Sequence, residues 1–250
     1  MMEQAPAAES GMPGLSVPDM DTAPVGEASS GPGDADSRAG FRFSRKLLLL
    51  SDPSSPQAES VGALRAHLLA QHVRNGRRSL ALCAPTEGSG TTFLSVNLAV
   101  AFAQAGINTL LIDANMRDPG VQNYIRPPEE PIGLRQCLSG DSSHTSMVYE
   151  DALQNLSVLY AGGVAENSQE LLASRQFKSL IDNCMREYEM VIVDTPPGVS
   201  AADGVRIGMV VGYVLVVVRR NESLVGDMRT LMDGLTADRV RIVGTFLNDF

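Results

Sequence analysis

Lysine is scarce in this sequence: among 250 residues the only two are Lys46 and Lys178. Acidic residues outnumber basic ones, 29 against 20, and the formal net charge is −9. A protein that binds nucleic acid through its general charge needs a basic surface instead. The composition therefore argues against nucleic-acid binding, and we expect no nucleic-acid partner.

Cysteines and long apolar runs are also few. The three cysteines, Cys83, Cys137 and Cys184, are widely spaced, odd in number and outside any CxxC pair, which predicts free thiols in a reducing compartment. The first residues, MMEQAPAAES, lack the basic and apolar parts of a signal peptide. The longest apolar run, KLLLL at 46–50, is too short to cross a bilayer. We expect a soluble, cytoplasmic protein.

The composition changes along the chain. Residues 1–40 are rich in Pro, Ala, Gly and acidic residues, with Arg38 the only basic one. Such a segment cannot bury enough apolar surface to offset the entropy of ordering, so it predicts a disordered acidic tail. A linker over 41–57 and one domain over 58–250 complete the predicted organisation.

Short apolar runs alternate with amphipathic stretches from about residue 58. Near-continuous Val, Ile and Leu runs separated by helices predict an α/β fold with a doubly wound, mostly parallel sheet covered by helices on both faces. The predicted strands are 79–83, 108–113, 156–161, 190–194, 213–218 and 240–247. The predicted helices are 59–73, 92–105, 168–187 and 222–236.

Three of these strands end in residues suited to a nucleotide site. The first leads into the glycine-rich stretch CAPTEGSGTTF at 83–93, and two others end in Asp113 and Asp194. Ligands of open α/β sheets bind beyond the carboxyl ends of the strands. Backbone N–H groups at a helix start can hold phosphates, while acids hold a metal or its water. Singly, the turn is also explained as a tight connection and each aspartate as a helix cap. Together they favour a nucleotide–Mg²⁺ site.

The order of motifs resembles the bacterial tyrosine kinases (BY-kinases) and related ATPases of capsule and exopolysaccharide biosynthesis. The likeness spans about residues 51–248. CAPTEGSGTTFLSVNLAVAFAQAG is similar to the family's Walker A region, TLLIDANMRDP to Walker A′ and VIVDTPPG to Walker B. SDPSSPQAESVGALRAHLL is similar to the family's assembly segment, and the closing GTFLN to its last strand. The resemblance thus implies a P-loop NTPase-like fold.

The resemblance also implies roles for individual residues. Asp113 and Asp194 would be catalytic, with Asp194 organising the metal and Asp113 orienting the incoming tyrosine. Thr92 and Asp194 would bind Mg²⁺, and Glu59 and Arg65 would join neighbouring subunits in a homo-oligomer. The residues expected to bind ATP are Glu87, Gly88, Ser89, Gly90, Thr91, Thr92, Arg117 and Asn248. Asn248 could equally be a turn residue, and Glu59 and Arg65 could equally be solvent-exposed residues of a helix with no role in assembly.

Several positions depart from the family pattern. Thr91 stands where the family's loop has a lysine, and Phe93 stands where it has a threonine near the α-phosphate. Asn115 replaces the second acid of Walker A′. Loss of one preorganised donor to a developing oxyanion slows catalysis by about 10²–10³-fold. An arginine, Arg117 or one from a neighbouring subunit, could substitute for the missing charge. In the assembly segment, Gly62 replaces the first arginine, which predicts a weaker or altered ring.

The family's kinases phosphorylate a tyrosine cluster at their C-terminus. Here five tyrosines are dispersed, and the sequence ends at GTFLNDF, so we expect no substrate tail of its own.

Two main hypotheses follow. The first is a degenerate BY-kinase-like protein that binds ATP and Mg²⁺ weakly. It would regulate polysaccharide chain length or export through a membrane co-polymerase partner, peripherally at the inner membrane. The alternative is an active ATP-dependent protein-tyrosine kinase that acts on another protein. A third class, the ATPases that position division sites or plasmids, needs a membrane-targeting tail or basic patches that this acidic sequence lacks.

Overall fold

The computed structural model describes residues 40–140, 146–198 and 202–249. Its main sheet has seven strands, and every neighbouring pair is parallel except the first. In spatial order they are β5 (Tyr149–Leu153), β6 (Leu156–Leu159), β3 (Thr109–Asp113), β7 (Met190–Asp194), β2 (Ser79–Cys83), β8 (Tyr213–Arg219) and β9 (Arg241–Asn248). This confirms the predicted α/β fold with a mostly parallel sheet.

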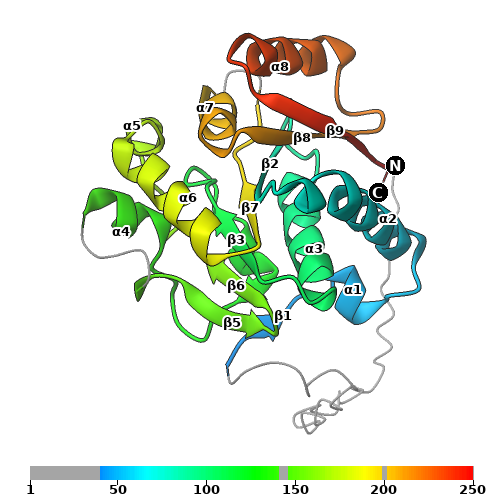
Figure 1. The fold of residues 1–250 in the computed structure, drawn as a ribbon, viewed down its shortest axis with the longest axis vertical. Coiled ribbons are helices and arrows are strands. Elements are labelled where there is room, and N and C mark those ends of the chain that lie inside the picture. The colour runs from blue at the N-terminus through cyan, green and yellow to red at the C-terminus, as the bar shows by residue number, and fades with distance from the viewer. Residues whose placement is uncertain (1–39, 141–145, 199–201, 250) are drawn as a thin grey trace, which may run out of the picture. The chain divides into compact units, whose positions relative to one another are not determined.

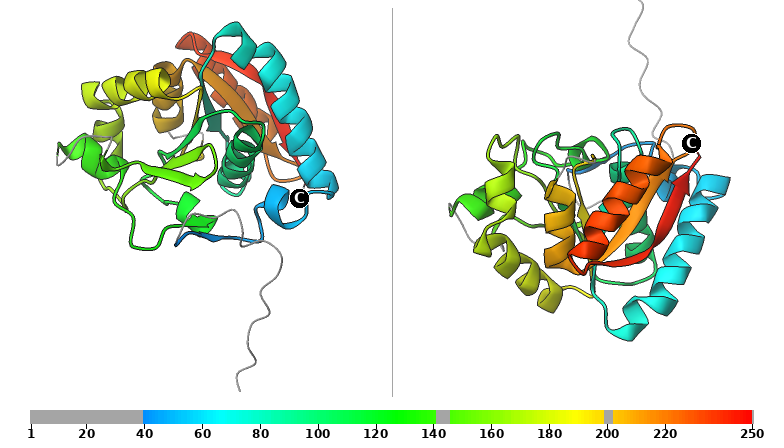
Figure 2. Two further views of the ribbon diagram at one scale, coloured as in Figure 1. Left: turned by 60° about the horizontal axis from the view of Figure 1, so that its bottom comes forward. Right: turned by 90° about the horizontal axis from the view of Figure 1, so that it is seen from above.

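Helices cover both faces of the sheet (Figures 1 and 2). One face carries α1 (Leu48–Ser51), α2 (Pro56–Gln71) and α3 (Thr91–Gln104). The other carries α4 (Leu134–Ser139), α5 (Ser168–Leu172), α6 (Arg175–Glu187), α7 (Ala202–Val211) and α8 (Val225–Ala237).

The sheet lies between two apolar cores. Successive strand residues point to opposite faces, so Leu80 and Leu82 of β2 join the core under α3, while Ala81 and Cys83 join the core under α7. All four side chains are at most 1% exposed. Burial on both faces is the reason why the strand sequences read as continuous apolar runs rather than alternating ones.

Some elements differ from the expectation. The helix predicted over 168–187 is two helices, α5 and α6, because the Ser174 hydroxyl accepts a hydrogen bond from Phe177 N (3.2 Å) and starts a new helix. The sequence analysis also missed α4, α7, the antiparallel edge strand β5, and a small sheet of β1 (Arg42–Phe43) with β4 (Ile125–Arg126).

The segment 41–57, predicted as a linker, packs on the domain. Leu47 is fully buried. Asn97 of α3 accepts from Leu48 N through Oδ1 (2.8 Å) and donates through Nδ2 to Lys46 O (3.1 Å). A buried amide needs such partners, and here the chain before the predicted boundary supplies them. The predicted tail over 1–40 lies outside the described residues, apart from Gly40.

No helix in the described ranges has the length and apolar character that a membrane span requires.

Candidate functional site: the glycine-rich loop and its acid pair

The loop between β2 and α3 lies at the carboxyl edge of the sheet. Gly88 and Gly90 have φ values of 74° and 85°, a left-handed conformation that favours glycine. At Gly90 a side chain would also collide with the amide of Asn248. The first N–H groups of α3, from Thr91 on, have no intrahelical acceptors, so the loop ends in a helix start that can hold an anion.

Side chains from distant segments hold the loop carbonyls. Asn248 donates from Nδ2 to Ser89 O (3.0 Å), and Arg219 donates from Nη1 to Gly88 O (3.1 Å). The Ser89 hydroxyl donates to Thr86 O (2.7 Å). Since three carbonyl oxygens of the loop are engaged, its backbone is set in one conformation before any ligand arrives.

The two aspartates meet where β3 and β7 end. Asp113 and Asp194 are register partners on these neighbouring strands, and both are at most 1% exposed. Asp113 accepts hydrogen bonds from three backbone N–H groups, Asn115 at Oδ1 (3.1 Å) and Gly120 and Val121 at Oδ2 (3.1 and 3.0 Å). These amides favour the ionised form of Asp113.

Hydroxyl groups of α3 bind the other carboxyl. Asp194 accepts from Thr92 Oγ1 (2.6 Å) and Ser95 Oγ (3.0 Å). Burial raises the pKa of Asp113 to about 6, and burial together with the Asp113 charge raises the pKa of Asp194 to about 8. Two carboxylates this close cannot both ionise easily. Without a cation, the pair therefore holds protons to a higher pH than ordinary aspartates do.

Thr92 and Asp194 suit a hard cation. Mg²⁺ prefers oxygen ligands and usually keeps several waters and substrate phosphates beside one or two protein ligands. The Thr92 hydroxyl and the Asp194 carboxyl adjoin, and α3 begins next to them. Among the described residues, no group of three or more His, Cys, Asp or Glu is placed to hold a metal ion, so a metal here would rely on phosphate and water for its other ligands.

The loop offers no ammonium group. Thr91, in the lysine position, is 6% exposed. Lys46 is an exposed residue before α1, and Lys178 is exposed on α6.

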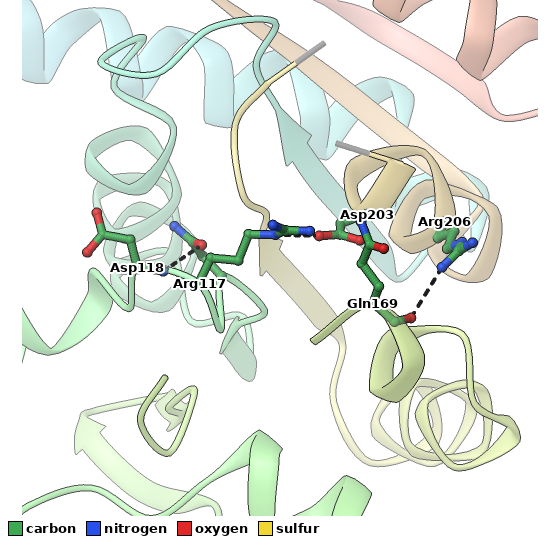
Figure 3. Close-up of polar contacts among 6 residues, drawn as sticks. Arg117, Asp118, Gln169, Asp203 and Arg206 are labelled. Atoms are coloured by element: carbon green, nitrogen blue, oxygen red, sulfur yellow. Dashed lines mark hydrogen bonds and ion pairs between the residues drawn. The ribbon is translucent and has the colours of Figure 1, made fainter. Parts of the chain in front are cut away.

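Two arginines at this edge, Arg219 and Arg117, are already engaged. Arg219 holds Gly88 O. Figure 3 shows Arg117 pointing from the Walker A′ segment toward α7, where its Nε donates to Asp203 Oδ2 at 2.8 Å. Asp203 is fully buried, while the Arg117 side chain is 49% exposed.

The predicted assembly residues lie on α2, away from the loop. Glu59 is exposed, and Arg65 is half-buried with Nη1 donating to Ala101 O of α3 (3.3 Å). Arg65 therefore has a structural contact within its own chain. Its predicted role in subunit contacts, and that of Glu59, stays a prediction.

The sequence analysis missed three residues that shape this site: Arg219, Ser95 and Ser223. Arg219 ends β8 and is the register partner of Asn248. Its place at the end of an apolar strand was the available signal. Ser95 lies about one helical turn after Thr92 on α3 and donates to the same carboxyl. Ser223 contacts the hydroxyls of Thr86 and Ser89 (3.3 and 3.4 Å), and nothing in the sequence pattern indicated it.

All five tyrosines lie in the described residues and are buried or half-buried. Tyr160 donates its hydroxyl to Ile125 O (2.8 Å), and Tyr213 stacks under Arg77. These contacts are those of packed side chains.

A parallel sheet with a pinned glycine-rich loop and two acids at its carboxyl edge defines a P-loop nucleotide-binding domain. A family model described as "AAA domain" matches residues 78–232, more than half of the chain. The chain belongs to this family, and its sequence is homologous to those of the bacterial tyrosine kinases (BY-kinases).

Individual proteins similar to this chain are also named as tyrosine kinases. A putative tyrosine-protein kinase, EpsB of Ralstonia nicotianae, is 32% identical over 81% of this chain, which spans only 27% of the EpsB length. A putative tyrosine-protein kinase, CapB of Staphylococcus aureus, is 29% identical over 81% of this chain and 88% of its own. The kinase domain of the Escherichia coli tyrosine kinase ETK has a TM-score of 0.76 and 28% identity, covering 81% of this chain and 79% of that domain.

Proposed function

We propose that this protein is a BY-kinase-like regulator in capsule or exopolysaccharide biosynthesis whose phosphotransfer is impaired. It binds ATP and Mg²⁺ weakly at residues 87–92, with Thr92 and Asp194 as metal ligands. Asn248 completes the nucleotide-binding set, and Arg117 joins it once Asp203 releases its side chain. Its output is contact with a membrane co-polymerase that controls polymer length or export.

The observation that carries this proposal is the buried, neutral Thr91 at the start of α3. In the family this position holds a lysine, whose charge would contact the nucleotide phosphates in both the ground state and the transition state. A hydrogen bond to a charged group contributes about 1.5–3 kcal/mol, and both states lose it here. Arg117 does not supply the charge in this conformation because Asp203 holds it.

The retained acids support the alternative, an active protein-tyrosine kinase. Asp113 and Asp194 are neighbours at the strand ends and Thr92 donates to Asp194, which suits metal-assisted phosphoryl transfer. In that mechanism Asp194 would hold the metal, and Asp113 would orient the incoming tyrosine or accept its proton. The packing of the five tyrosines requires that the substrate be another protein.

A matched set of variants separates the two functions. We expect Thr91→Lys to restore nucleotide affinity, so that saturating ATP·Mg²⁺ raises its melting temperature by about 5–10 °C. The native chain should shift by less than about 2 °C. Thr91→Gln, which adds length without charge, controls for shape, and Thr91→Lys with Phe93→Thr restores both changed positions.

Radiolabel transfer from the γ-phosphate to a tyrosine gives the second readout. A native chain that shifts as much as Thr91→Lys, or that transfers label, contradicts impaired phosphotransfer and favours the active kinase. Weak binding with no label transfer in the native chain, together with a clear gain in Thr91→Lys, supports the proposal.

A further inference from the structure

A second pocket lies at the opposite edge of the sheet from the glycine-rich loop. It has a volume of about 340 Å³ and forms where the C-terminal part of α2 meets the first residues of β8 and β9. Figure 2 shows α2 running alongside β9 in both views. The size falls within the range of about 300–1,000 Å³ typical of small-molecule sites.

Cationic and hydrogen-bonding side chains line this pocket, and none of its lining residues is acidic. The polar members are His67, Gln71, His72, Arg77, Tyr213 and Arg241. A larger pocket of about 980 Å³ lies beside β4. It has no clear preference for an anionic or a cationic ligand, because both arginines and glutamates line it (Arg42, Arg126, Arg135, Glu129 and Glu130). In an acidic protein with a net charge of −9, a pocket with only positive charges is distinctive.

The pocket contains a buried nitrogen that has no partner. His72 is 1% exposed, and its Nε2 lies 2.9 Å from Ser79 O. A carbonyl oxygen only accepts, so Nε2 carries the hydrogen and Nδ1 is left without one in the neutral ring. His72 Nδ1 has no hydrogen-bond partner, although buried polar atoms are nearly always paired. The unpaired nitrogen points to a ligand that supplies its partner.

The charged groups around His72 converge. The Arg77 guanidinium lies 5.1 Å from the centre of the Tyr213 ring, and this ring packs edge-on against His72 at 4.7 Å. Arg241 is the register partner of Tyr213 on the neighbouring parallel strand, so the two side chains lie on one face. Neither Arg77 nor Arg241 forms an ion pair within the described parts of the chain.

We propose that this pocket binds a small phosphorylated anion, either inorganic phosphate or a phosphate ester, between Arg77, Arg241 and His72. Two guanidinium groups match the oxygens of a phosphate. An imidazole that gains a proton beside the anion donates Nδ1–H to it. Leu68, Ile242 and Val243, which also line the pocket, provide an apolar wall for the body of an ester.

The effect of burial on His72 agrees with this assignment. Burial, with a smaller contribution from the Arg77 charge, lowers the pKa of His72, so the ring is neutral in the free protein. An anion in the pocket opposes both influences and raises the pKa again.

Histidine-ring NMR of the full chain tests the proposal. Only three histidines exist, and two of them, His67 and His72, line this pocket. Titration with inorganic phosphate, at constant ionic strength set with chloride, should move both ring signals saturably. Glycerol phosphate in a parallel titration distinguishes the two sources: a tighter response assigns the pocket to an ester, and equal responses assign it to phosphate itself.

Variants fix the location. Arg77→Gln and Arg241→Gln should each weaken phosphate binding about tenfold or more, the loss of one charge-assisted hydrogen bond. Arg74→Gln, an equal charge change at an exposed residue that does not line the pocket, should leave it unchanged. In His72→Gln the side-chain amide can still donate to Ser79 O, but the second nitrogen is lost. This variant should weaken binding as read at His67.

Three results would overturn the proposal. They are the absence of a saturable shift at His67 and His72, an equal loss of binding in Arg74→Gln, and shifts confined to the backbone amides of Gly88–Thr91. The last would place the anion in the glycine-rich loop. Each variant should still unfold well above the temperature of the titration, which establishes that any loss of binding is not a loss of fold.

Discussion

The two edges of the sheet carry opposite chemistry. At the carboxyl edge, a glycine-rich loop shaped for phosphate lies beside two buried carboxyls, and its cation position holds Thr91. At the amino edge, Arg77, Arg241 and His72 share one pocket with no carboxylate. The loop has the backbone for an anion without the charge, whereas the amino-edge pocket has the charge without such a loop.

The difference places backbone shape at one edge of the sheet and positive charge at the other, two features that phosphate binding uses together. Loop shape depends on glycines and on side chains that hold carbonyls, such as Asn248 on Ser89 O and Arg219 on Gly88 O. These contacts join distant segments, so they stabilise the fold as well as the loop, and none of them involves the side chain at position 91.

The pH dependence of the free energy of unfolding should give the largest difference between the two edges. In metal-free buffer, the raised pKa of Asp194 means that its contribution to stability is complete below its ordinary value of 3.8 and is lost as the pH rises through about 8. The free energy of unfolding should fall between pH 6 and pH 8, by up to about 1.4 kcal/mol per pH unit for one proton. Asp194→Asn should flatten this fall. Denaturation with urea at several pH values measures it.

The amino edge should respond to pH in the opposite direction. The lowered pKa of His72 means that its contribution is present above its ordinary value of 6.5 and is lost as the pH falls below it. Arg77, Tyr213 and the Ser79 carbonyl face the ring. His72→Gln should flatten only the acid side of the curve. A fall of stability toward pH 8 that persists in Asp194→Asn would contradict the assignment to the acid pair.

Glycine substitutions should have the next largest effect. Gly90→Ala imposes a left-handed alanine and displaces the Asn248 amide. We expect a loss of about 2–3 kcal/mol in the free energy of unfolding, from backbone strain and one hydrogen bond. Gly106, after α3, has a similar φ of 79° with open space around it, so Gly106→Ala should cost only about 1–2 kcal/mol. Equal losses would show that Asn248 does not constrain the loop.

Two arginine substitutions should produce the smallest effects. Arg219→Gln releases Gly88 O, which water can then bind, so the loss should stay below about 1.5 kcal/mol. Amide hydrogen exchange should speed up at Gly88–Thr92 and leave the His72 ring signal unchanged. Arg77→Gln removes a cation–π contact worth about 0.5–1 kcal/mol. It should shift the His72 ring signal and leave amide exchange at Gly88–Thr92 unchanged. Effects of either variant at both edges would mean that the edges are coupled.

Part of the site was predictable because it depends on strand ends. In a parallel sheet all carboxyl ends lie at one edge, so Asp113, Asp194 and the loop after Cys83 had to share it. That the two aspartates are direct neighbours was not predictable, because it depends on β3 pairing with β7. The order of strands is a property of the whole sheet rather than of any local pattern.

Other features depend on contacts between segments far apart in the chain. The engagement of Arg117 by Asp203 requires α7 to lie beside the Walker A′ segment. The packing of residues 41–57 requires Asn97 on a buried face of α3. The pocket around His72 joins α2 to strands that begin more than a hundred residues later. Local periodicity carries no information about such contacts.

The sequence alone determined the alternation of strands and helices, the glycine-rich loop, the family, and the replacement of its lysine by Thr91. The alternation and the loop follow from residue type and spacing, which act over a few positions, whereas the family and its lysine position come from the resemblance of the motifs to those of known kinases. Only the tertiary structure decided how strongly the paired carboxyls hold protons, which arginines are already engaged and where a second set of cations gathers. Burial and charge proximity set these properties, and both arise when distant segments pack together.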